Sequence, residues 1–312
     1  MYKGKEEKVF YDLHVHTNES DGKYTKLQIL NFMNIHKFAA VAFCDHNICN
    51  NNDVELIQTQ YIKQYGNSNS VKIIPSIELD ADNEIYRRIH ILGYGIKNGE
   101  LITEKLMEYQ IKNVEATISQ INKINDIYKT NITPAMVEKI EKTKYISSKG
   151  IKQILIKLRL AESIRDTYKF VSRKSPTHVN REKISDIDII KLIHDSGGVA
   201  ILAHPIEISR KDNNQKLGYG NEYKQYLEFL IKNGLDGVES HTIKHNNEEK
   251  EKYYQINSEF GIISTAGTDF HDELRTPQLG VMVDPEFFLF PLLDRIKKKQ
   301  NIIKEYNNDY ER

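Results

Sequence analysis

The sequence is poor in cysteine and carries no excess of charge of either sign. Its two cysteines, Cys44 and Cys49, cannot form a disulfide framework in a chain of 312 residues. Because no cysteine cluster is present, a structural zinc finger and an iron–sulfur site are also excluded. Lysine plus arginine and aspartate plus glutamate number 44 each, so no global charge indicates a nucleic-acid or membrane partner. Any recognition by charge must therefore be local.

Long apolar runs are missing as well. Nowhere do about eighteen apolar residues follow one another, and the first residues, MYKGKEEKVFYDL, do not suit a signal peptide. We therefore expect a cytoplasmic protein with no membrane partner, and we infer no obligate protein partner. Cys44 is expected to pack as a small apolar residue in a buried strand.

Short apolar segments, bounded by glycine, proline or polar clusters, recur through the first hundred residues. They read YDLHVH, FAAVAFC, VKIIPSIEL and RIHILGYG. Near-continuous apolar residues are typical of strands buried in a parallel sheet. Between the first two segments, TKLQILNFMNIHK predicts a crossover helix, and strand–helix–strand is the unit of such a sheet.

The character of the sequence changes between residues 97 and 183. This stretch is long, charged and helical in its periodicity, and Thr133 with Pro134 predicts the start of a second helix within it. We therefore predict an α/β domain formed by residues 1–96 and 184–312, with residues 97–183 as a helical insertion. After the insertion, Ser185 is expected to cap a helix, and VAILAHP to form a strand.

Histidines and carboxylates close the predicted strands. They are His14 and His16, Asp45 and His46, Glu78, His90, His204, Glu239 and His241, and Asp269 and His271. Ligands bind at the carboxyl ends of strands in α/β folds, and side chains at i and i+2 of a strand face the same side. His14 and His16 thus face one centre, and Asp269 and His271 repeat the pattern. Imidazole with carboxylate suits zinc, manganese or iron, in numbers that exceed the needs of one ion.

Taken in order, these segments resemble the motifs of the polymerase and histidinol phosphatase (PHP) phosphoesterases. The matching motifs are DLHVHT, SDG, FCDHN, PSIEL, HILGY, LAHP, GVE and GTDFH, within residues 10–96 and 184–283. The HTNESDG spacing and the insertion before GGVAILAHP look like the branch that acts on nucleotides and short oligonucleotides. The resemblance implies an α/β fold, a distorted (β/α)7 barrel with a helical insertion. It also implies three divalent ions as cofactors, Mn²⁺, Zn²⁺ or Fe²⁺.

Carried over by position, the resemblance implies a ligand set for each ion. The first ion would be held by His14, His16, Glu78 and Asp269, the second by Glu78, His90 and His204, and the third by Asp21, His46 and His271. Glu78 would bridge the first two ions. Every one of these positions carries a residue type that the family uses, so a competent enzyme is expected.

Other residues are expected to act around the metals. Asp12 and Glu239 would orient the metal-binding groups, and Asp45 would either do the same or act in catalysis, although a turn carboxylate is an equal alternative for Asp12 and Asp45. His241 is the candidate that assists the leaving group, and His245 is a weaker one. The alternative for both histidines is a polar loop residue.

Cations near the mouth of the site would bind phosphate or base. The expected ones are Arg181 and Lys149, with Arg210 and Arg275 as further candidates, and each also fits a solvated surface charge.

The expected reaction is hydrolysis of a phosphate monoester by a metal-bridging hydroxide. The substrate would be a nucleotide, such as a nucleoside monophosphate or a 3′,5′-bisphosphate, or a small phosphometabolite. A 5′–3′ exonuclease on short oligonucleotides and a histidinol-phosphate phosphatase are alternatives, and neutral net charge disfavours long nucleic acid. A non-catalytic metal-binding regulatory module is the alternative from a different class, and its mark would be the loss of several ligands.

Overall fold

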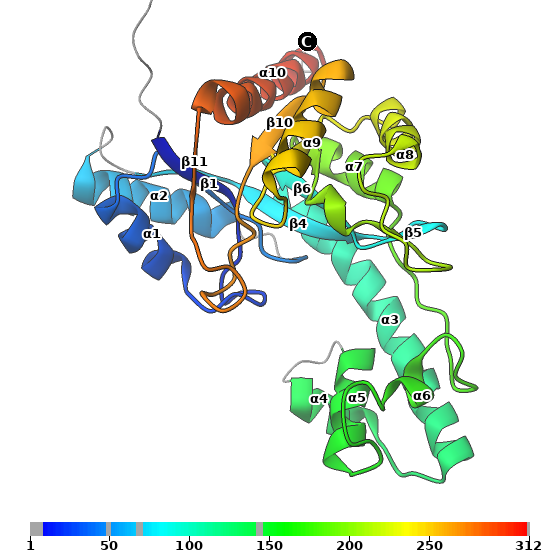
Figure 1. Ribbon diagram of the computed structural model, residues 1–312. Helices are drawn as coiled ribbons and strands as arrows, with labels where there is room; N and C mark the ends of the chain where they lie inside the picture. Colours follow the sequence, from blue (N-terminus) through cyan, green and yellow to red (C-terminus); the bar gives the residue numbers. More distant parts are fainter. Residues whose placement is uncertain (1–8, 48–50, 67–70, 142–145, 311–312) are drawn as a thin grey trace, which may run out of the picture. The chain divides into compact units, whose positions relative to one another are not determined.

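The computed structural model describes residues 9–47, 51–66, 71–141 and 146–310 (Figure 1). The chain forms two compact units, the first from Met1–Thr103 with Ile184–Arg312 and the second from Glu104–Lys183. Cys49 lies outside the described residues. Among the described helices, none combines the length and the apolar character needed to cross a membrane.

Two sheets form the centre of the first unit, which confirms the predicted α/β class. One has the strand order β11-β1-β2-β3, and the other has the order β10-β9-β7-β6-β4. The strands of the first sheet are β1 (Val9–Val15), β2 (Ala40–Phe43), β3 (Lys72–Ile74) and β11 (Val281–Val283). Those of the second are β4 (Ser76–Ala81), β6 (Ile89–Tyr94), β7 (Val199–Leu202), β9 (Gly237–His241) and β10 (Ile263–Ala266). A small ribbon pairs β5 (Tyr86–Arg87) with β8 (Ser209–Arg210).

Helices of the first unit follow the strands along the chain. They are α1 (Lys26–Ile35), α2 (Asn51–Tyr65), α7 (Asp186–Asp195), α8 (Asn221–Lys232), α9 (Asn247–Glu259) and α10 (Pro285–Tyr310), with a 3₁₀ turn at Pro205–Glu207. The predicted crossover helix is confirmed as α1, whose N-cap Thr25 accepts a hydrogen bond from the Gln28 amide. Ser185 likewise accepts from the Asp188 amide and caps α7, as predicted.

The expected strand–helix–strand unit of a parallel sheet does not hold at β6. This strand pairs antiparallel with both β4 and β7. Only residues 82–88 join β4 to β6, and a parallel connection needs a crossover of about a dozen residues or more. His90 therefore lies at the start of β6 instead of its end. Because β6 runs in reverse, that start meets the same edge of the sheet as the ends of β7 and β9.

Apolar side chains pack on both faces of the strands. Cys44 lies in a buried cluster with residues of β1, β2, β6 and β7, which is the packing role predicted for it. Burial raises the pKa of its thiol to about 12. A second buried cluster packs α1 and α2 against β1 and β2 through Leu30, Met33 and Tyr61. The packing of α1 and α2 thereby holds the ends of β1 and β2 in place.

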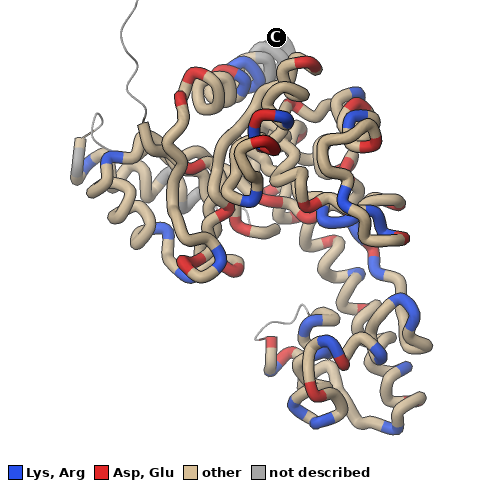
Figure 2. The backbone as a smooth tube through the Cα atoms, viewed as in Figure 1, with Lys and Arg blue, Asp and Glu red and all other residues tan. Residues whose placement is uncertain are grey.

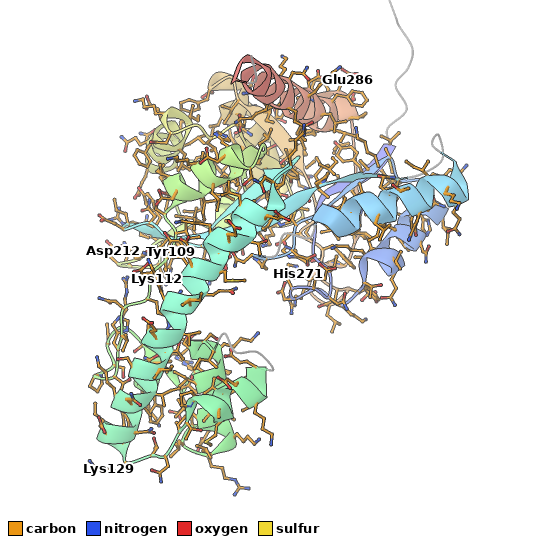
Figure 3. The ribbon with its side chains drawn as sticks, turned by 180° about the vertical axis from the view of Figure 1, so that it is seen from behind. Tyr109, Lys112, Lys129, Asp212, His271 and Glu286 are labelled. Atoms are coloured by element: carbon orange, nitrogen blue, oxygen red, sulfur yellow. The ribbon has the colours of Figure 1, made fainter. Side chains whose placement is uncertain are left out.

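The second unit contains most of α3 (Gly99–Tyr128), with α4 (Pro134–Glu141), α5 (Ser148–Lys157) and α6 (Tyr168–Val171). Its own buried core includes Ile121, Val137 and Phe170. As predicted, the helix that begins at Pro134 is capped by Thr133, whose hydroxyl accepts from the Met136 amide at 3.3 Å. On α3, the Lys112 ammonium lies 5.7 Å from the centre of the Tyr109 ring one turn earlier (Figure 3). Charges of both signs are interspersed along each unit (Figure 2).

Candidate metal centre

Imidazoles and carboxylates from both sheets meet at one edge of the first unit. Three groups with ligand atoms within 4.8 Å of one another hold the predicted ligands: His14, His16, Glu78 and Asp269; Glu78, His90 and His204; and His16, Asp21, His46 and His271. A fourth such group joins His46 and His90 to Asp80. The structure therefore brings together all nine side chains for which a ligand role is predicted. The first three groups coincide with the three implied ligand sets, except that His16 also lies beside the third.

Glu78 is fully buried at the centre of the cluster. Its Oε1 lies 2.9 Å from His90 Nδ1 and 3.1 Å from His204 Nε2. Its Oε2 lies 3.1 Å from His16 Nε2 and 3.5 Å from His14 Nε2. Burial alone would raise the pKa of this carboxyl, but the surrounding histidines hold it well below its usual range. The two oxygens thus face two different groups, as a bridging ligand requires.

Asp269 completes the group on the other side of His16. Its Oδ1 lies 3.0 Å from His16 Nε2 and 3.4 Å from His14 Nε2. Asp269 has a backbone φ of 56° and His204 a φ of 22°, both unusual for residues other than glycine. Such conformations cost about 1–3 kcal/mol each and gather at functional sites. The backbone is therefore locally strained at Asp269 and His204, and this conformation directs both side chains into the cluster.

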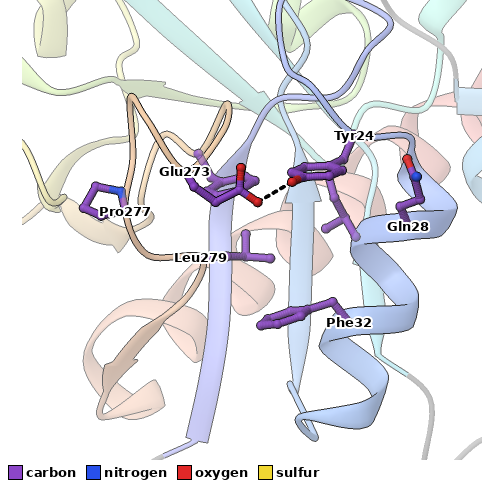
Figure 4. Close-up of a pocket in the computed structure, with 8 residues that line it drawn as sticks. Tyr24, Gln28, Phe32, Glu273, Pro277 and Leu279 are labelled. Carbon is purple, nitrogen blue, oxygen red and sulfur yellow. Dashed lines mark hydrogen bonds between the residues drawn. The ribbon is translucent and has the colours of Figure 1, made fainter.

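Phe270, between Asp269 and His271, turns the other way. It lines an apolar pocket of about 480 Å³ with Tyr24, Phe32 and Leu279 (Figure 4). The Tyr24 hydroxyl donates a hydrogen bond to Glu273 at the pocket's rim. Asp269 and His271 lie together on the side away from this ring, with Asp269 Oδ1 3.6 Å from His271 Nδ1.

The third group is the most exposed of the three. His271 Nε2 lies 3.1 Å from Asp21 Oδ1, and the Asp21 side chain is 46% exposed. His271 Nδ1 donates to the Asp269 carbonyl at 2.8 Å, so Nε2 is left free to face Asp21. Arg275, one of the expected phosphate-binding cations, instead donates to Asp21 Oδ2 at 2.8 Å.

Glu239 orients two of the histidines, as expected. Its Oε1 accepts from His14 Nδ1 at 3.1 Å, and its Oε2 accepts from the His204 amide at 2.9 Å. Because Nδ1 is engaged by Glu239, Nε2 is the nitrogen that faces Glu78 and Asp269 and that would bind a metal once deprotonated.

Asp12 and Asp45 accept hydrogen bonds from backbone amides and hydroxyls and not from an imidazole ring, which fits the alternative of a turn carboxylate for both. Asp12 accepts from the amides of His14, Thr268 and Gly280, and burial raises its pKa to about 6. Asp45 accepts from the Thr17 amide at 2.8 Å and from its hydroxyl at 2.7 Å, with a further bond from Ser20. Both oxygens of Asp45 are thus engaged by the loop that carries Asp21, and the expected catalytic role finds no geometric support.

His241 does not join the cluster either. Its ring packs against Phe288, with centroids 4.3 Å apart, and against Tyr254, and burial lowers its pKa to about 4. Strand alternation would place it on the same side as Glu239. The pairing of β9 with β10 shifts register between Thr265 and Ala266, however, and such an irregularity re-aims side chains. His245 is also held structurally, because its Nδ1 bonds the Ser240 carbonyl at 2.8 Å.

The variant His241→Phe tests this placement. It preserves the ring contact with Phe288, so we expect metal content to be unchanged and turnover to stay within about threefold of wild type. Steady-state kinetics and elemental analysis measure both quantities. A loss of two orders of magnitude in turnover with full metal content would restore the catalytic role.

The expected substrate-binding cations of the insertion lie in the second unit. Arg181 donates to Gln120 Oε1 at 2.8 Å, and burial lowers its pKa. Lys149 lies in the first turn of α5, where its amide donates to the cap residue Ser147. Their role toward a substrate stays a prediction. In the first unit, Arg210 is paired with Asp212 and Glu222.

Sequence reasoning missed Asp80 and Lys244. Asp80 Oδ1 lies 3.4 Å from both His46 Nδ1 and His90 Nε2, and Asn47 donates to its Oδ2 at 3.1 Å. The signal was present, because Asp80 follows Glu78 at the i+2 spacing that faces one side of a strand. For Lys244, the sequence carried no signal except its position shortly after β9.

The variant Asp80→Asn should weaken metal binding without removing a ligand group. Its carboxylate lies beside one imidazole of the second group and one of the third, and losing such support typically costs about 10- to 100-fold in metal affinity. Competition with a chelator measures that affinity. Equal affinities for the variant and the wild type would exclude a positioning role for Asp80.

The cluster fits divalent metal ions. Buried atoms without a hydrogen-bond partner gather in it: Glu78 Oε2, Asp269 Oδ1, His16 Nδ1, His46 Nδ1 and His204 Nδ1. Buried polar atoms without partners are rare and costly, and cations would satisfy those that face a group's centre. Imidazole nitrogen with carboxylate oxygen is a donor set for zinc, manganese or iron.

Without metal, the protein is expected to lose stability as pH rises from 6.5 toward 9. Burial would lower the pKa of His16, but its contacts with Asp269 and Glu78 outweigh burial and raise the pKa from 6.5 to about 9. The folded state then binds more protons than the unfolded state in this window, so stability is full below pH 6.5 and declines above it, by about 3 kcal/mol at most. Thermal unfolding in chelator at pH 6 and pH 9 measures the difference.

Metal-loaded protein should show the opposite trend, because bound histidines must be deprotonated. A flat profile for the metal-free protein would contradict the expectation.

No protein-family model matches the chain. Two curated relatives cover most of it. The phosphoribosyl 1,2-cyclic phosphate 1,2-diphosphodiesterase of Eggerthella lenta is 22% identical over 277 residues, 87% of this chain and 98% of the relative. The 5′-3′ exoribonuclease Rnm of Escherichia coli is 23% identical over 278 residues, 87% of this chain and 88% of the relative.

Two solved structures share the fold. A proposed metal-dependent phosphoesterase of Bifidobacterium adolescentis superposes with a TM-score of 0.60 at 21% identity, over 93% of this chain and 96% of that one. An amidohydrolase of Chromobacterium violaceum with bound sulfate gives a TM-score of 0.64 at 17% identity, with the same coverage. In its motifs and its fold the chain is thus similar to the PHP phosphoesterases, and its imidazole and carboxylate groups fit divalent metal ions.

Proposed function

We propose that the chain hydrolyses a phosphate monoester of a nucleotide, such as a nucleoside monophosphate or a 3′,5′-bisphosphate. The observation that carries this proposal is the convergence of nine imidazole and carboxylate side chains into three neighbouring groups, two of which share Glu78. Three divalent ions would occupy the three groups, with Glu78 shared by two of them. Asp21, Glu78 and Asp269 cancel only part of the ions' charge, and the excess favours a phosphate dianion.

The wall of the site is proposed to be a distorted seven-stranded barrel. Isolated bridges join the two sheets on both sides, Val15 with Phe270 and His46 with Glu78. They support closure through the strand series β1, β2, β4, β6, β7, β9 and β10. We assign the chemistry to the barrel unit and a share of substrate binding to residues 97–183.

Bound divalent ions would lower the pKa of water from about 15.7 to roughly 7 and withdraw charge from the phosphate oxygens. The protein's own groups hold the site ready for this. Glu239 engages His14 Nδ1 and so turns Nε2 toward the ligand group, and Asp45 fixes the loop that presents Asp21. Since Glu78 and Asp269 are almost fully buried, the reacting phosphate would meet few competing water molecules on that side.

A 5′–3′ exoribonuclease is the second candidate. The observation that favours it is the likeness to the Escherichia coli enzyme of that name along 87% of this chain. The neutral net charge fits oligonucleotides of a few residues better than long RNA.

Phosphate release by the manganese-loaded protein tests the proposal. The panel holds nucleoside monophosphates, 3′,5′-bisphosphates, histidinol phosphate and 5′-phosphorylated oligoribonucleotides of two to five residues, with mononucleotide products followed by chromatography. Turnover of nucleotides above the other substrates supports the proposal, and release of mononucleotides from oligonucleotides supports the second candidate. No turnover at full metal occupancy would leave the non-catalytic metal-binding module as the better account.

A further inference from the structure

Lys244 lies at the rim of the metal-ligand cluster, in the loop between β9 and α9. Its Nζ is 2.5 Å from Asp269 Oδ2 and 2.7 Å from Glu207 Oε2, and its side chain is 30% exposed. None of the roles described so far uses this ammonium group.

The two oxygens of Asp269 have different neighbours. Oδ1 faces His14 and His16 and has no hydrogen bond, whereas Oδ2 faces Lys244. The ammonium therefore sits beside the ligand carboxylate without occupying the oxygen that the histidines share. A metal on Oδ1 and a lysine on Oδ2 are compatible.

Glu207 holds the lysine from the other side. It lies in the turn that directly follows His204, and its Oε2 is 3.4 Å from His204 Nδ1. Lys244 is thus fixed between a residue of the first ligand group and a neighbour of the second. An ammonium group has three N–H donors, and the two carboxylates take two of them. One donor and an exposed part of the side chain remain for a ligand.

We propose that Lys244 binds a non-bridging oxygen of the substrate's phosphoryl group and makes the site favour a terminal phosphate over a phosphodiester. This inference rests on the proposed function. A monoester carries two negative charges near neutral pH and a diester carries one, so a fixed cation beside the metals stabilises the monoester more. The ordered ion pairs with Asp269 and Glu207 hold that cation in position before substrate arrives.

The test compares Lys244→Met, Lys244→Arg and the control Lys232→Met. Methionine keeps most of the side chain's volume but removes the charge. Lys232 lies in α8, is 70% exposed and pairs with Glu228, so its replacement changes the net charge equally at a distance from the cluster. The readouts are metal content, the dissociation constant of inorganic phosphate for manganese-loaded protein, and kcat/KM for p-nitrophenyl phosphate and bis(p-nitrophenyl) phosphate.

For Lys244→Met we expect unchanged metal content and phosphate affinity reduced roughly tenfold or more, as for loss of a charge-assisted hydrogen bond. The ratio of monoester to diester kcat/KM should fall by a similar factor. Lys244→Arg should retain most of the wild-type phosphate affinity and most of the preference for the monoester. Lys232→Met should match the wild type in both quantities. Wild-type phosphate affinity in Lys244→Met, or loss of metal that accounts for the defect, would overturn the assignment.

Phosphate binding separates this inference from the proposed function, because it requires no turnover. If the wild type hydrolyses no ester but its phosphate affinity depends on Lys244, the proposed function fails while the lysine's role stands. If nucleotides are hydrolysed and Lys244→Met matches the wild type in every readout, the function stands and the lysine's role fails.

Discussion

Replacing Glu78 by glutamine is expected to lower turnover by about three orders of magnitude or more and to reduce metal content by more than one ion. Each oxygen of Glu78 faces a different ligand group, so a neutral amide weakens two groups at once. The amide nitrogen would also point donors at metal-binding atoms. Elemental analysis after dialysis and steady-state kinetics measure the two effects.

Glu228→Gln is the matched control for this variant. Glu228 lies in α8, and its side chain is 52% exposed. Its replacement by glutamine makes the same chemical change outside the cluster. Circular dichroism of both variants checks that they are folded. Wild-type metal content in a folded Glu78→Gln protein would show that the ligand assignment is mistaken.

Replacing His14 by alanine should damage both the metal centre and the stability of the protein. The imidazole faces Glu78, Glu239 and Asp269, and all four side chains are nearly or fully buried. Removing one member of a buried charged cluster leaves the others without compensation, at a cost of about 3–5 kcal/mol. Denaturant unfolding in chelator measures this loss separately from metal binding, which elemental analysis follows.

His36→Ala is the control for His14→Ala, since His36 caps the end of α1 and is exposed. We expect it to retain metal and stability within about 0.5 kcal/mol of wild type. If the denaturant midpoint of His14→Ala equalled that of the wild type, the protein in solution would lack the buried contacts that the structure shows around His14.

The side chains of the site could largely be identified from the sequence because strand geometry is simple. Spacing by two places His14 and His16 on one side, and likewise Asp269 and His271, and the fold then brings these pairs together. The same rule would have found Asp80, which lies two residues after Glu78. Buried strand patterns and the capping residues Thr133 and Ser185 predicted the main elements for the same local reason.

What could not be predicted depends on contacts between distant segments. The side that His241 faces follows from a register shift between β9 and β10, and the direction of β6 follows from a short connection. The position of Lys244 depends on Asp269 and Glu207, which come from two other loops. No periodicity within one segment carries such information.

The reversed direction of β6 has a consequence for how the centre assembles. Glu78 and His90 are 12 residues apart and share one hairpin, whereas His14 and Glu239 are 225 residues apart. Loops that close over short stretches lose less chain entropy, so local contacts form sooner. The hairpin is therefore expected to bring together two of the three side chains of the second ligand group early in folding. The group around His14 and Asp269 can form only when the two ends of the domain have met. A metal ion bound at the group around His14 and Asp269 would thus show that the domain has finished folding. A metal ion bound by Glu78 and His90 alone would not show this.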